Sequence, residues 1–245
     1  MNKPRQIPWP SITAEAVAIV ISILLAFGID AWWSNRQEKT RVDESLFALR
    51  NELQTNLEEI QRERKFRTTV IASIDQLFEM SAEGERAAQT VDDLLEDVTW
   101  GGRIDVSTGA LVSILESGSL ASIDDGALKR SISSLPTLYE TTSSHERDAS
   151  RYLDTELLNY MNENGSLVQI YNAGIGKGRP GGGEMTIDEG FPQQEQVNHL
   201  PLLKSKAFLG LLAVMLGKHD GILLYYDRLD AAMQRSIELI DKHLD

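Results

Sequence analysis

The sequence predicts an all-α protein in which an N-terminal transmembrane helix continues into an antiparallel helical bundle with long helices. A run of 14 uncharged residues, 16–29, lies near the N-terminus with tryptophans on both sides. Apolar residues then recur at steps of three and four over long stretches at both ends of the remaining chain, as on one face of a helix. No glycine or proline separates the first of these stretches from the uncharged run.

The predicted anchor is residues 11–33, which follow a short N-terminal tail at residues 1–10. Trp9 and Trp32 are 23 residues apart. That separation is about 35 Å along a helix, close to the thickness of a bilayer's hydrocarbon core and its edges. Tryptophans are enriched at both membrane–water interfaces. The end of the run is a poor small-x-small cleavage site, so we expect an uncleaved single span.

Five residues are predicted to form the membrane anchor and a possible helix contact: Trp9, Glu15, Asp30, Trp32 and Trp33. Both acids lie near the ends of the span. A charge at the bilayer centre costs roughly 3 kcal/mol on insertion scales and much less near the edges. Two interpretations stay open, namely tolerated edge charges, or a helix–helix contact or polar relay inside an oligomer.

The orientation of the span is predicted from its flanking charges. Lys3 and Arg5 favour a cytoplasmic N-terminus, whereas three basic residues after the span favour the opposite. The segment that follows, residues 34–245, is long, and long segments obey the charge rule poorly. We therefore expect this domain outside the cytoplasm.

Several segments resemble a family of uncharacterised bacterial single-pass membrane proteins. These segments are "AEAVAIVISILLAFGIDAWWSNRQE" with "ESLFALRNELQTNLEEI", then "ALVSILESGSLASIDDGALKRSISSLPTLY" and finally "LLYYDRLD". The span positions that match the family are Glu15, Ala26, Ile29, Asp30 and Trp32. The resemblance implies a single-pass protein of the bacterial inner membrane with a helical domain, and it implies no particular activity.

Two long helices with the same spacing are predicted at the ends of the domain, and we expect them to pack together. The first extends from the anchor to near Gly84, and the second reaches the C-terminus. The expected core positions of the first are Val42, Leu46, Leu49, Leu53, Leu57, Ile60, Ile71, Ile74 and Phe78. Those of the second are Ile222, Tyr226, Leu229, Met233, Ile237, Ile240 and Leu244.

Shorter elements are predicted between them. A helix capped by Ser107 or Thr108 precedes a turn at residues 116–122, and Asp124 caps the next helix. Pro136 is expected to kink or restart that helix. Residues 172–192 are glycine-rich and are predicted to form a flexible loop. Residues 206–218 read as a buried core helix, because 11 uncharged residues between two lysines are too few for a span.

The charge and the cysteine content of the chain argue against several classes of function. The 245-residue chain has a formal net charge of −13, carried by the part after the anchor, which disfavours nucleic-acid binding. Cysteine is absent, which excludes disulfides, a cysteine nucleophile and cysteine-based metal sites. The expected partners are the lipid bilayer and either a second copy of the chain or another membrane protein.

No catalytic, cofactor-binding or metal-binding residues are predicted. None of the four histidines forms the Glu-x-x-His helix motif, and "GIGKGRPGGG" lacks the spacing of a phosphate-binding loop. Glu195 and His199 are too weak a pair to assign a metal. We expect a scaffold or subunit of a membrane assembly rather than an enzyme, with an extracytoplasmic sensor of a small ligand as the alternative.

Overall fold

The computed structural model describes residues 9–83, 88–175 and 196–245, without the side chains of residues 9–19, 83, 88 and 89. Every regular element in these ranges is helical, which confirms the all-α fold class. The α-helices are α1 (Trp9–Glu83), α2 (Ala88–Val98), α3 (Gly109–Glu116), α4 (Gly126–Tyr152), α5 (Leu158–Asn164), α6 (Leu167–Ala173) and α7 (Lys206–Leu244). Two 3₁₀ turns, Ser119–Ser122 and Leu200–Lys204, and a π-helical segment, Leu153–Leu157, complete the set.

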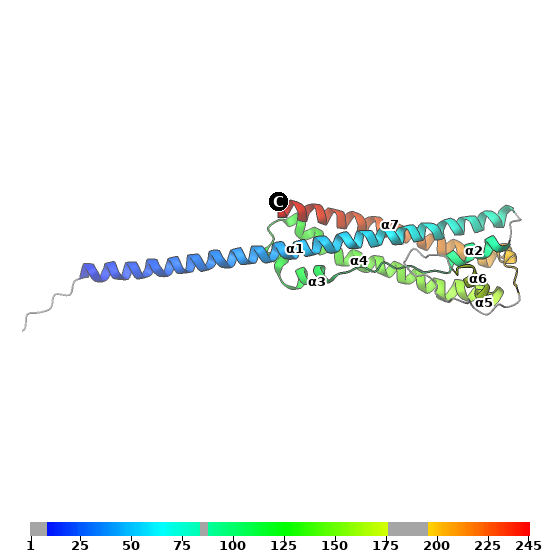
Figure 1. The fold of residues 1–245 in the computed structure, drawn as a ribbon, viewed down its shortest axis with the longest axis horizontal. Coiled ribbons are helices and arrows are strands. Elements are labelled where there is room, and N and C mark those ends of the chain that lie inside the picture. Colours follow the sequence, from blue (N-terminus) through cyan, green and yellow to red (C-terminus); the bar gives the residue numbers. More distant parts are fainter. Residues whose placement is uncertain (1–8, 84–87, 176–195) are drawn as a thin grey trace, which may run out of the picture.

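Helix α1 is a single rod of 75 residues, or about 110 Å at the α-helical rise. The prediction that the apolar N-terminal segment continues into the domain without a break is confirmed. Its N-terminal part projects alone beyond the other helices (Figure 1). Side chains at residues 20–37 are all exposed, and the first buried one is Val42.

Helices α1 and α7 pack antiparallel, as their shared spacing predicts. Arg50 pairs with Asp241 at 2.5 Å, and Arg64 pairs with Asp227 at 2.6 Å. Residues later in α1 therefore pair with residues earlier in α7, as expected for antiparallel helices. Helix α4 also packs along α7, so these three long helices form the body of the bundle (Figure 1).

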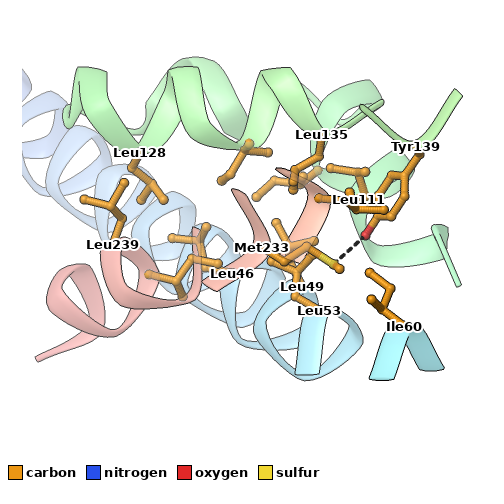
Figure 2. Packing of buried hydrophobic residues seen from close by; sticks show 14 of the residues in the cluster. Leu46, Leu49, Leu53, Ile60, Leu111, Leu128, Leu135, Tyr139, Met233 and Leu239 are labelled. Carbon is orange, nitrogen blue, oxygen red and sulfur yellow. Dashed lines mark hydrogen bonds between the residues drawn. The ribbon is translucent and has the colours of Figure 1, made fainter. Parts of the chain in front are cut away.

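The core is divided into two hydrophobic clusters. The proximal cluster, next to the projecting part of α1, joins α1, α3, α4 and the C-terminal half of α7 (Figure 2). The distal cluster joins the end of α1 to α2, the π-helical segment, α5, α6 and the start of α7. Representative members of the proximal cluster are Leu46, Leu49, Leu135 and Met233, and those of the distal cluster are Ile74, Leu95, Leu157 and Phe208.

Helix α7 is the one described helix that could cross a membrane by length and composition alone. A core helix of a bundle can have the same length and composition, so this criterion does not distinguish a membrane span from a core helix. Phe208, Leu212 and Met215 are fully buried in the distal cluster, which agrees with the predicted core helix at residues 206–218. The predicted span at residues 11–33 lies on α1, partly among side chains that are not described.

Several local predictions differ from the structure. Asp125, not Asp124, caps α4, accepting hydrogen bonds from Ala127 N and Leu128 N. Of the two outcomes expected at Pro136, a kink or a restart, the restart does not occur, because α4 continues through this residue. The predicted loop at residues 172–192 begins two residues early, because α6 extends to Ala173, and its residues 176–192 lie outside the described residues.

A side chain from α1 caps α3. Thr108 is the residue before α3, but its side chain makes no capping bond. Glu52 accepts hydrogen bonds from Ala110 N at 2.7 Å and Leu111 N at 3.0 Å instead. A carboxylate at this position satisfies free N–H groups and favours the positive end of the helix dipole.

We expect Glu52→Ala to lower the free energy of unfolding by about 1 kcal/mol, the usual cost of losing a helix cap. Denaturant unfolding of the full chain in mild detergent, followed by circular dichroism, measures it. The control is Glu58→Ala, an exposed glutamate on the same helix. Equal losses in the two variants would contradict a capping role for Glu52.

Candidate functional site

The predicted anchor residues lie on the projecting part of α1. Asp30, Trp32 and Trp33 are exposed there. Trp9 and Glu15 belong to α1, but their side chains lie outside the described residues. The large apolar side chains of this stretch are each about half exposed or more: Val20, Ile21, Ile23, Leu24, Leu25, Phe27, Ile29, Trp32 and Trp33.

Aromatic and cationic groups mark the end of this apolar stretch. The Trp32 and Trp33 ring centroids are 6.3 Å apart. The guanidinium carbon of Arg36 lies over the Trp32 ring, 5.8 Å from its centroid, within the range of a cation–π contact. This order, with tryptophan first and arginine next, fits the passage from hydrocarbon to headgroups at a membrane interface.

A buried polar layer separates the proximal cluster from the distal cluster. Its members are Glu63 and Arg67 from α1, Glu146 from α4, and His219 and Tyr226 from α7. None is more than 4% exposed. Charged side chains are rarely buried to this extent unless they are paired. The hydrogen bonds and ion pairs of each group therefore determine its charge and its role in the layer.

Arg67 is the centre of the buried polar layer. Its Nε donates to Tyr226 Oη at 3.0 Å, and its Nη1 donates to His219 Nδ1 at 3.2 Å. Its Nη2 donates to the carbonyl oxygen of Gly102 and lies 3.5 Å from Glu146 Oε1. One guanidinium thus joins α1 to α4, to α7 and to the loop that contains Gly102.

Glu146 receives donors from three directions. Besides the ion pair with Arg67, its Oε1 accepts hydrogen bonds from Tyr226 Oη and from Ile104 N at 3.1 Å. Burial is the main reason that the pKa of Tyr226 lies above its ordinary value, so this phenol keeps its proton and acts as a donor. Three donors therefore converge on one oxygen of the Glu146 carboxylate, Oε1.

Two atoms of the layer have no hydrogen-bond partner within the described structure: Glu63 Oε2 and His219 Nε2. His219 Nδ1 must accept from Arg67, so the proton of the neutral ring lies on Nε2. Burial, with a smaller effect from Arg67, lowers the pKa of His219 to about 3. Burial raises the pKa of Glu63 to about 7, against the opposing effect of Arg67.

The loop between α2 and α3, residues 99–108, is called the strap below. It runs lengthwise along α1 in the opposite direction, from Gly102 beside Arg67 to Ser107 beside Asn56. Its backbone is held by side chains rather than by a backbone ladder. Asn56, 1% exposed, accepts from Ser107 N at 2.9 Å and donates to Ser107 O at 2.7 Å. Asn56 also donates to Tyr139 Oη, which in turn contacts Met233 Sδ (Figure 2). The strap is therefore tied to both the proximal cluster and the buried polar layer.

A second polar network closes the distal end. His199 Nδ1 lies 2.6 Å from Asp92 Oδ1, and His199 Nε2 accepts from Ser166 N at 2.9 Å. Both ring nitrogens are therefore engaged, and Glu195, the other half of the weak metal pair, lies outside the described residues. Among the described side chains, no group of three acids or histidines is placed to hold a metal ion.

The two remaining histidines, His145 and His243, are not fully buried. His145 is exposed and stacks on Tyr225 with 4.0 Å between ring centroids. The adjacent residue, Glu146, occupies the buried position instead. His243 is half-buried, 3.7 Å from Asp43.

Chemically, the buried polar layer can hold a proton and can order the strap. The chain matches no protein-family model, no curated protein and no solved structure.

Proposed function

We propose that this chain is a single-pass membrane protein whose helical bundle acts through protein–protein contacts, as a scaffold or subunit of a membrane assembly. The observation that carries the proposal is the apolar stretch of α1, which is exposed on all sides and continuous with the bundle. A helix that is apolar all round is buried in a protein core or in a membrane. This stretch packs against none of the other described helices.

The proposed location is the bacterial inner membrane, with the span at residues 11–33 and the bundle on the periplasmic side. Support comes from the family resemblance and from the basic residues Lys3 and Arg5 in the tail. A rigid α1 would hold the bundle at a fixed distance from the bilayer, because the span and the first bundle helix form one rod. The partner is a second copy of the chain or another membrane protein, and no reaction is assigned to the bundle.

We expect Ile21→Arg to weaken membrane insertion by about 3 kcal/mol, the cost of arginine near the centre of a span. The fraction of chain that resists alkaline carbonate extraction measures this loss. The control is Phe47→Arg, because Phe47 is an equally exposed apolar residue of α1 alongside the bundle. Resistance that Ile21→Arg leaves unchanged would contradict the anchor.

Orientation and association need separate measurements. Because the chain has no cysteine, Ala121→Cys places a single exposed thiol on the bundle. Labelling by an impermeant maleimide in cells with a permeabilised outer membrane is the expected result, and labelling only after lysis would reverse the orientation. Crosslinking in mild detergent is expected to give defined larger species, whereas a monomer without crosslinked partners would contradict the scaffold proposal.

A further inference from the structure

The strap is anchored at both ends, and its middle part, residues 102–104, rests on the buried polar layer. At the α3 end, Ser107 makes two hydrogen bonds with Asn56, and Glu52 caps the helix that follows. At the α2 end, Thr99 and Trp100 bond to Glu96, and the Trp100 ring meets the Tyr171 ring edge-on. In the middle of the strap, the polar contacts are Arg67 with Gly102 O and Glu146 with Ile104 N. Both of the latter contacts come from the buried polar layer, so the state of that layer decides how residues 102–104 are held.

Glu63 touches the strap without a hydrogen bond. A Cβ placed on Gly102 would lie 2.2 Å from Glu63 Oε2 and 2.8 Å from the Phe66 ring. The carboxyl oxygen is therefore packed directly against Gly102, and a side chain at this position would require Glu63 and Phe66 to move. That same oxygen is the atom without a partner.

The groups around Glu63 do not balance a second negative charge. On α1 they are Glu59, Arg62 and Arg67; on α4, Glu146; on α7, His219 and Tyr226. The two charged side chains of the strap, Arg103 and Asp105, are exposed. The donors of Arg67 already serve Tyr226, His219, Gly102 and Glu146. An ionised Glu63 would therefore be a buried charge with an unsatisfied oxygen, which is costly.

We propose that Glu63 is a proton-operated latch for the strap. With its proton bound, residues 102–104 stay closed on the buried polar layer. When the proton leaves, this middle part of the strap lifts and admits water to the carboxylate, while the ends held by Glu96 and by Asn56 and Glu52 stay in place. The chain thereby changes its surface between α1 and α4 with the pH of its compartment.

The pH range over which the strap opens is set by the burial of Glu63. The pKa of Glu63 is raised to about 7 in the closed state, chiefly by desolvation, against an ordinary value of 4.5. Opening returns the carboxyl to water, so the open state binds the proton less tightly than the closed state. Opening therefore becomes easier as pH rises from about 4.5 to 7 and levels off above that. This inference goes beyond the proposed function and does not depend on membrane insertion.

Hydrogen exchange of the full chain in mild detergent tests the latch. The amide of Ile104 reports the middle part of the strap, and the amide of Ser107 reports the anchored α3 end. After correction for intrinsic exchange rates, we expect opening at Ile104 to increase more than tenfold between pH 5 and pH 7. We expect Ser107 to change little over the same range.

Two variants separate the latch from other titrations. Glu63→Gln removes the proton site in nearly the same shape, and Glu63→Leu fills it with an apolar group if the amide folds poorly. Either is expected to abolish the pH dependence at Ile104. A wild-type chain whose Ile104 exchange is flat with pH, or a variant that keeps the tenfold increase, would overturn the proposal.

Discussion

Replacing Arg67 with methionine is expected to lower the free energy of unfolding by about 3–5 kcal/mol, because it leaves a buried carboxylate without its cation. Arg67 is 1% exposed and is the largest fully buried side chain. Its loss also removes the donors to His219 and to the carbonyl oxygen of Gly102. Urea unfolding of the full chain in mild detergent at pH 7 measures the effect.

The control for this prediction is Arg64→Met, one turn away on the same helix. Arg64 pairs with Asp227, whose side chain is 62% exposed, and exposed pairs contribute less than about 1 kcal/mol. The double variant Arg67→Met with Glu146→Leu is expected to recover most of the loss, because it removes both buried charges together. Similar losses for Arg64→Met and Arg67→Met would show that the buried polar layer is not energetically central.

The long helices could be predicted because their pattern is local. No proline or glycine interrupts α1 from Asp30 to Glu83, and the shared spacing of α1 and α7 indicated that they pack together. Exact core positions were less accurate. Asn56 and Ser236 are buried, whereas Leu57 and Ile237, the adjacent predicted core residues, are only half-buried. Small polar side chains can occupy core-facing positions of a helix when a group on another element forms a hydrogen bond with them. The spacing of residues along one helix does not reveal that partner.

The buried polar layer was missed for the same physical reason. The seam of α1 continues from Ile60 through Glu63 and Arg67 to Val70 in steps of three and four. A charged residue in such a pattern normally lies on the solvated face. One signal could have revealed the layer. The apolar core-facing rows of α4 and α7 also contain an acidic or basic residue each, Glu146 and His219, so three helices carry such a residue in their core-facing rows.

Acidification is expected to stabilise the wild-type chain relative to Glu63→Gln. Because the pKa of Glu63 is raised from 4.5 to about 7 in the folded state, the folded chain keeps a proton that the unfolded chain releases within this window. The contribution of Glu63 is therefore fully present below pH 4.5 and is lost as pH rises through 7. The difference corresponds to about 3 kcal/mol. Urea unfolding of both proteins at several pH values between 4.5 and 8 measures it.

The comparison between the two proteins is needed because His219 acts in the opposite direction. Its pKa is lowered from 6.5 to about 3, so its contribution to stability is lost as pH falls from 6.5 to 3. Over much of the range from 4.5 to 6.5 the two effects oppose each other in the wild type, and its stability alone would look nearly flat. In Glu63→Gln only the His219 effect remains, so stability should rise up to pH 6.5 and then level off. Parallel curves for the wild type and Glu63→Gln across pH 4.5–8 would rule out Glu63 as the group that binds the proton.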